Sequence, residues 1–130
     1  MAITLPPPGV QGSELFLGPA MREKSILIVP GTSDYVTGGY VVSALQAGFL
    51  STYGIMMAWV SGQNSTAAGY VPQITLALAQ LATSGAGFEG YAQFKFQVFV
   101  TGTASGDVLN EASSGVNLSG AIWVVTCRGQ

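Results

Sequence analysis

The chain has 130 residues, a length typical of one domain. Only 8% of the residues are charged, against about 25% in ordinary soluble domains, while 48% are apolar. With four basic residues and a formal net charge of −2, no basic patch can form, so we expect no nucleic-acid ligand. No apolar run approaches the length of a membrane helix, and no export signal is recognisable at the N-terminus, so we expect the chain to work in the cytoplasm or in something assembled there.

The most unusual feature is a long stretch without charge. From Tyr35 to Phe88 there is no aspartate, glutamate, lysine or arginine, and the whole chain lacks histidine. A chain this apolar must bury surface, and one small domain has limited interior in which to do so. We therefore expect a subunit that hides part of its surface against other proteins and forms a homo-oligomer.

Residues 1–19 are expected to form an extended N-terminal arm ahead of a domain over residues 20–130. The three prolines favour polyproline II geometry and remove three backbone donors. A disordered tail is the alternative, but the apolar run Leu15-Phe16-Leu17 favours an arm that docks on a partner. The candidate contact residues of the arm are Ile3, Leu5, Pro6, Pro7, Pro8, Leu15, Phe16 and Leu17.

The next segments predict strands and one short helix. Ser25–Val29 is a buried strand closed by Pro30-Gly31. Ser43 and Gln46 form a capping-box pattern, and Gly48 ends the predicted helix after barely one turn. Ser51–Ser61 is an apolar strand on both faces, so both faces need cover. Tyr53, Met56, Met57 and Trp59 on this strand are expected in the core, with a subunit interface as the alternative; the interface candidates are Met56, Met57 and Trp59.

The C-terminal half predicts more strands separated by glycine-rich turns. Tyr70–Leu81 alternates with period two, although a helix over Ile74–Leu81 stays open. Tyr91–Thr101 alternates most clearly, and Ala121–Arg128 forms the last strand after a long polar loop over Gly102–Gly120. In the clearest strand, the residues expected to face inward are Ala92, Phe94, Phe96, Val98 and Val100. The fold class expected is all-β: a single β-sandwich or jelly-roll-like domain with one short helix.

Catalytic and cofactor chemistry is not expected. Without histidine, no Ser-His-Asp or Cys-His arrangement can exist, and the single cysteine, Cys127, is expected to be a small buried apolar residue. The carboxylates outside the arm region sit in predicted loops, where solvation is the ordinary outcome: Asp34, Glu89, Asp107 and Glu111. The GxGxxG pattern over Gly85–Gly90 leads into a strand instead of a helix, so it predicts a turn and no dinucleotide site. No metal ligand set is present, and the chain is not expected to be an enzyme.

One resemblance bears on function. Tyr35-Val36-Thr37-Gly38-Gly39-Tyr40, the short segment Ser43–Gly48 with Phe49, the strand start Gly69-Tyr70-Val71 and the element Asn117-Leu118-Ser119 together resemble small head decoration (cement) proteins of tailed bacteriophages. The likeness covers roughly residues 24 to 128. It implies an all-β subunit, often trimeric, that sits on the outside of the capsid.

The resemblance therefore implies a virion protein, assembled in the host cytoplasm, that binds the outer surface of the major capsid protein lattice and stabilises the head. The expected partners are the major capsid protein and further copies of the chain itself, with a trimer as the expected oligomer. The alternatives are another phage structural module, associated with a tail or fibre, and a β-sandwich that binds carbohydrate.

Overall fold

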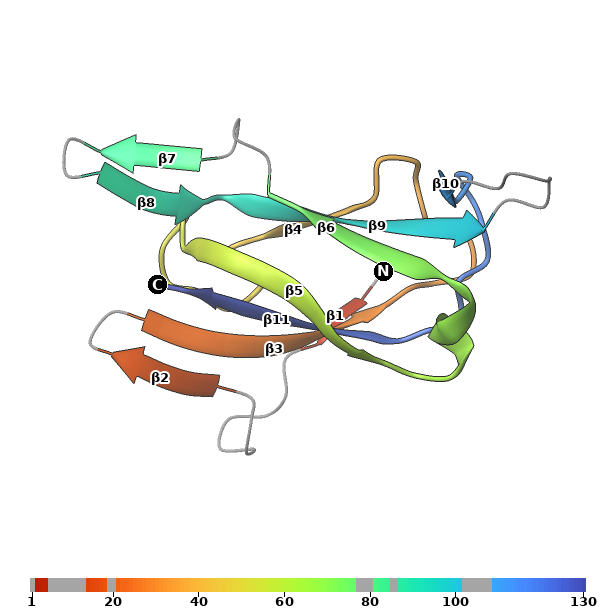
Figure 1. Ribbon diagram of the computed structural model, residues 1–130, viewed down its shortest axis with the longest axis horizontal. Helices are drawn as coiled ribbons and strands as arrows, with labels where there is room; N and C mark the ends of the chain where they lie inside the picture. Colours follow the sequence, from red (N-terminus) through yellow and green to blue (C-terminus); the bar gives the residue numbers. More distant parts are fainter. Residues whose placement is uncertain (1, 5–13, 19–20, 77–80, 85–86, 102–108) are drawn as a thin grey trace.

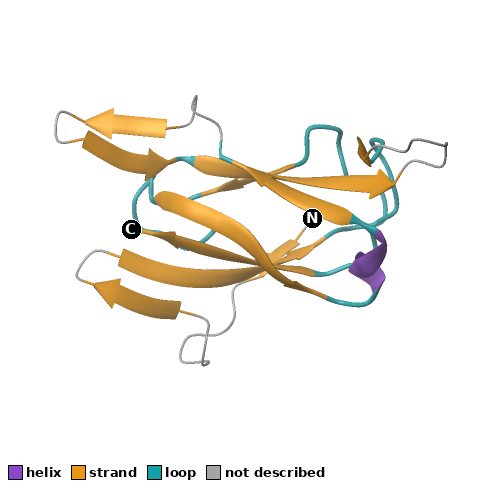
Figure 2. Ribbon diagram, viewed as in Figure 1, coloured by secondary structure: helices purple, strands orange, loops and turns teal. Residues whose placement is uncertain are grey.

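The computed structural model describes residues 2–4, 14–18, 21–76, 81–84, 87–101 and 109–130 (Figure 1). These residues form two antiparallel sheets with almost no helix, which confirms the all-β, sandwich-like fold (Figure 2). Within the described residues the one helical segment is a 3-10 turn, η1, at Thr66–Gly69.

The larger sheet has seven strands. At its centre β11 (Trp123–Gly129) lies between β3 (Met21–Val29) and β5 (Ile55–Gln63). On the other edge of β3, β1 (Ala2–Thr4) pairs with the C-terminal end and β2 (Glu14–Gly18) with the N-terminal end. Beyond β5, β8 (Gly87–Tyr91) pairs with it at one position and with β7 (Leu81–Ser84) along a hairpin.

The smaller sheet is built on β9 (Gln93–Thr101). Strand β6 (Val71–Thr75) pairs along one edge of β9, and β4 (Tyr40–Ser43) and β10 (Leu109–Glu111) follow one another along the other edge. The alternation predicted for this strand is confirmed at its centre, since Phe94, Phe96 and Val98 are buried and Lys95 is exposed.

The core lies between the two sheets. The larger sheet contributes Ile26, Ile28, Val125 and Cys127, and the predicted burial of Cys127 is confirmed. Burial raises the pKa of the Cys127 thiol to about 12, so it stays protonated at neutral pH. Trp123 joins the two layers, because its ring lies 5.2 Å from Phe96 of the smaller sheet.

The short helix predicted at Ser43–Gly48 is a single turn instead. Its capping box is present: Ser43 N–H donates to Gln46 Oε1 at 3.0 Å, and Gln46 N–H donates to Ser43 Oγ at 3.1 Å. Gly48 adopts φ +94°, and Phe49 N–H donates back to Ala44 O at 3.0 Å. This glycine C-cap closes the turn before a helix can form.

Several strand boundaries differ from the prediction: β3 begins at Met21, β9 at Gln93 and β11 at Trp123, and β10 lies within the segment predicted as a long polar loop. The apolar strand expected from Ser51 begins at Ile55, because Ser51 and Gly54 hydrogen-bond to Gln130 at the C-terminus and hold residues 44–54 as a loop. Of the segment left open as strand or helix, Ile74 lies in β6 and Leu81 begins β7. The residues between them from 77 to 80 lie outside the described part.

Candidate interaction surfaces

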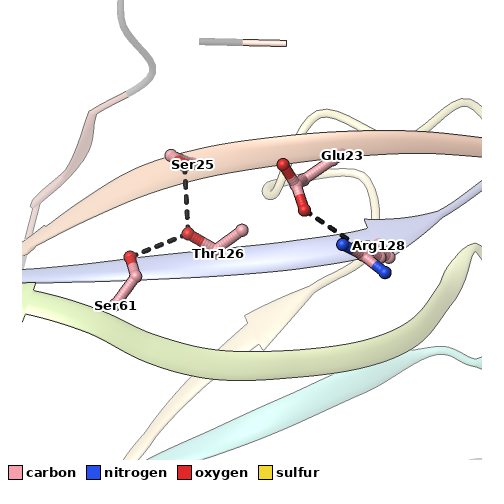
Figure 3. A network of polar contacts seen from close by, with 5 residues as sticks. All are labelled: Glu23, Ser25, Ser61, Thr126 and Arg128. Carbon is pink, nitrogen blue, oxygen red and sulfur yellow. Dashed lines mark hydrogen bonds and ion pairs between the residues drawn. The ribbon is translucent and has the colours of Figure 1, made fainter. Parts of the chain in front are cut away.

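The outer face of the larger sheet carries a polar row across three strands (Figure 3). The Ser25 and Thr126 hydroxyls lie 3.1 Å apart, and the Thr126 hydroxyl donates to Ser61 Oγ at 2.7 Å. Thr126 points away from the core but is only 7% exposed, so its hydroxyl is satisfied by its neighbours instead of by bulk water. The row ties β3, β11 and β5 together through side chains as well as backbone.

Beside this row lies an ion pair whose cation packs against an aromatic ring. Arg128 Nε donates to Glu23 Oε1 at 2.9 Å (Figure 3), and the guanidinium lies 5.5 Å from the centre of the Trp59 ring. Both contacts come from directly paired strands, because Arg128 stands opposite Glu23 on β3 and Met57 on β5. The pair is partly solvated, so its contribution to stability is small, but it fixes Arg128 over Trp59.

The predicted subunit-interface residues lie on β5, and the core interpretation for them is wrong. Met57 is 46% exposed, Met56 and Trp59 are partly exposed, and Tyr53 lies in the preceding loop at 40% exposure. Ile55 is the residue of β5 that lies in the buried core, and Ala58 and Val60 are partly buried and pack against that core. Their role as an interface stays a prediction.

The arm residues fall partly within the described chain. Ile3 lies in β1, and Leu15, Phe16 and Leu17 lie in β2, so these segments are strands at the β3 edge. Leu5 and the three prolines, Pro6, Pro7 and Pro8, lie outside the described residues. Contact of the arm with another protein stays a prediction.

A second apolar surface, the β4–β5 loop over residues 44–54, was not predicted from the sequence. Leu45 is 57% exposed and Leu50 is 73% exposed, and neither has a charged residue near it in sequence. The loop is held in place by buried Ala44, Ala47 and Phe49, and by its bonds to Gln130. The capping box and Gly48 were a signal that Leu45 lies in a short exposed turn. The loop as a whole was not predicted, because Ser51–Ser61 was predicted to be a strand.

At the opposite end of the domain, Tyr35 organises the loops. Its hydroxyl donates to Glu111 Oε1 at 2.9 Å and accepts from Val98 N–H at 3.0 Å, in the gap on β9 between β4 and β10. Gly38 N–H also donates to Glu111, and these two bonds hold the pKa of Glu111 below its ordinary value. The Tyr40 hydroxyl donates to Asp34 Oδ1 at 2.7 Å. The carboxylates of Asp34 and Glu111 thus hold these loops in place through hydrogen bonds.

Removing the Tyr35 hydroxyl should therefore destabilise the domain. Tyr35→Phe leaves Val98 N–H without its acceptor in the core and removes a charged bond to Glu111, so we expect the free energy of unfolding to fall by about 2 kcal/mol. Tyr53→Phe, at an exposed tyrosine, is the matched control and should change it by less than about 0.5 kcal/mol. Urea unfolding of the two variants checks the difference; equal midpoints would show that the bonds are dispensable.

Other sequence patterns are structural in the described part. Asn64, in the polar segment after β5, accepts at Oδ1 from Ala67 N–H and Ile122 N–H, and its amide donates to Gly120 O at 2.7 Å. Gly87–Gly90, from the GxGxxG pattern, lies in strand β8 and pairs with β7, so the turn predicted there is wrong over these residues, and no helix follows them. Among the described residues, no group of three or more histidine, cysteine or carboxylate side chains could hold a metal ion.

The chain matches no protein-family model, no curated protein and no solved structure. Within the described residues, no helix is long and apolar enough to cross a membrane.

Proposed function

We propose that the chain is a decoration (cement) protein of a tailed bacteriophage, which binds the outer surface of the major capsid protein lattice and stabilises the head. The main support for this proposal is the β4–β5 loop, which exposes large apolar side chains to solvent on a backbone that is fixed by hydrogen bonds and buried residues. Leu45 and Leu50 are exposed, while Phe49 between them is only 2% exposed. A braced loop loses little entropy on binding, so its apolar side chains can contribute most of their burial to affinity.

The absence of charge in this region favours a protein partner. The loop lies in the uncharged stretch Tyr35–Phe88, so it is suited to an apolar protein surface and has no means of pairing with phosphate. A lattice presents many identical copies of such a surface, so each contact need only be modest for the particle to gain stability. We also propose that the protein acts as a homo-oligomer, with three copies as the expected number.

The loop gives a direct test of lattice binding. Leu50→Lys places a charge at a large apolar residue that is 73% exposed, so it should not disturb folding but should lower occupancy on phage heads at least tenfold. Leu109→Lys, on β10 at the other end of the domain, is the control and should bind as the unmodified protein does. Occupancy is measured by incubating each protein with undecorated heads and quantifying the bound fraction after sedimentation. Equal binding by both variants would show that the β4–β5 loop does not contact the lattice. No binding by the unmodified protein would contradict the proposed function.

A further inference from the structure

The ion pair on the outer face of the larger sheet is fixed in place but uses only part of its hydrogen-bonding capacity (Figure 3). Arg128 bonds Glu23 through Nε alone, so within the described residues its two terminal nitrogens and the second oxygen of Glu23 have no partner. The Arg128 side chain is 42% exposed and that of Glu23 is 23% exposed, so these atoms can be reached from solvent. Donors and an acceptor thus stand side by side, already ordered by the Trp59 ring and by each other.

The hydroxyl row next to this pair presents acceptors. Since the Thr126 hydroxyl donates its one proton to Ser61, Ser25 must donate to Thr126. Ser61 in turn donates to Val124 O at 3.4 Å. Every proton of the row is used within it, so the exposed Ser61 oxygen offers a lone pair to the outside.

Apolar surface completes the same area. Trp59 is partly exposed beside the guanidinium, and Met57, 46% exposed, stands directly opposite Arg128 on the neighbouring strand. From Glu23 through Arg128 to Met57 the area crosses two strand spacings, about 10 Å. This is the footprint of a small ligand and much less than a stable protein interface buries.

The charges of this face select against ionic ligands. Glu23 and Arg128 neutralise each other, whereas Arg22 and Lys24 alternate with Glu23 along β3 and therefore lie on its opposite face. An anion bound at Arg128 would meet the Glu23 carboxylate, and a cation bound at Glu23 would meet the guanidinium. An apolar protein surface would bury the ion pair without replacing its water, which is costly. A fitting ligand therefore has neutral hydroxyls, which both donate and accept, together with apolar C–H surface.

We propose that this face is a binding site for a neutral carbohydrate. Sugar hydroxyls accept from the terminal nitrogens of Arg128 and donate to the free oxygen of Glu23 and to Ser61, as charge-assisted bonds where the protein group is ionised. The C–H face of a sugar ring packs on Met57 and on the exposed part of Trp59, whose indole combines an apolar body with a polarisable ring. The site does not include the β4–β5 loop, so this inference goes beyond lattice binding and does not depend on it.

A glycan array tests the site. The labelled protein is applied to neutral glycans built from glucose, galactose, mannose and N-acetylglucosamine, and to sialylated and sulfated glycans. We expect binding to neutral glycans in preference to acidic ones. Calorimetry with the neutral glycan bound most strongly should show affinity at least tenfold lower for Arg128→Gln, because the charged donors are lost. Lys95→Gln is the matched control: it removes one exposed cation from the smaller sheet and should leave the affinity unchanged.

Three results would overturn the carbohydrate site: no binding to any neutral glycan of the array, a preference for the acidic glycans, or equal affinities of Arg128→Gln and Lys95→Gln. If Arg128→Gln does not fold by circular dichroism, nuclear magnetic resonance of the unmodified protein decides. The glycan should then shift the amide resonances of Glu23, Trp59 and Arg128, and shifts confined to other residues would contradict the site. A protein that decorates phage heads but binds no carbohydrate contradicts this inference alone, whereas carbohydrate binding without head binding contradicts only the proposed function.

Discussion

Trp123→Ala is expected to lower the free energy of unfolding by about 3–5 kcal/mol, the largest effect of any single substitution proposed for this protein. The Trp123 side chain is fully buried and lies 5.2 Å from Phe96 and 6.3 Å from Tyr70, measured between ring centres. Its indole N–H has no hydrogen-bond partner among the described residues, so the loss comes from packing and the cavity left behind. Typical domains have only 5–15 kcal/mol of stability, so the variant should be close to unfolding at physiological temperature.

Trp59→Ala is the matched control for this substitution. Trp59 is a tryptophan on the neighbouring strand, but it lies on the outer face under Arg128 and is partly exposed. Removing the Trp59 side chain should therefore lower the free energy of unfolding by about 1 kcal/mol, as expected for an ordinary surface contact. Urea unfolding followed by far-ultraviolet circular dichroism measures both. If the two substitutions cost the same, Trp123 does not join the two sheets as described.

Gly129→Ala is expected to lower the free energy of unfolding by about 3 kcal/mol, the upper end of the usual range for adding a side-chain atom to a packed region. A Cβ at this position would overlap the carbonyl oxygen of Gly54, and a Cβ on Gly54 would meet the carbonyl oxygen of Gln130. The obstructing atoms are backbone, so a change of rotamer cannot relieve the overlap. Because Gln130 N–H donates to Gly54 O at 2.8 Å, the strain should also displace the β4–β5 loop and weaken lattice binding.

Gly69→Ala provides the control, since no atom lies within 4 Å of a Cβ added there and its φ is not positive. This substitution should be neutral or slightly stabilising, because alanine has fewer unfolded conformations than glycine. Thermal unfolding of the two variants, together with occupancy on phage heads, checks both parts of the prediction. A Gly129→Ala protein as stable as the Gly69→Ala protein would show that β11 and the loop are not in contact as the structure has them.

The fold class and the central strands could be predicted because their signals are local. Alternation of Phe94, Phe96 and Val98 with polar residues reports one buried face, and the continuous run at Ser25–Val29 reports a strand within a sheet. The capping box at Ser43 and the stop at Gly48 were also readable from local sequence, although the segment between them is a turn and not a helix.

The surfaces could be predicted only in part, because exposure depends on contacts between distant segments. An apolar stretch such as Ser51–Ser61 predicts burial on average, yet the backbone of Gln130 hydrogen-bonds to Ser51 and Gly54 and holds the first four residues as a loop. The pairing of Glu23 with Arg128 likewise needs the register of β3 against β11, which no local pattern encodes. The arm residues could be identified by composition, but not their strand partner.

A cryo-electron microscopy reconstruction of the phage particle tests the central claim most directly. Density for this all-β domain is expected on the outer surface of the head, repeated over the lattice, with the end that carries Leu45 and Leu50 against the major capsid protein. Copies should be grouped around a three-fold position, as the proposed homo-oligomer of three copies requires. A head without such density, or the domain found in the tail instead, would contradict the proposed role as a head decoration protein.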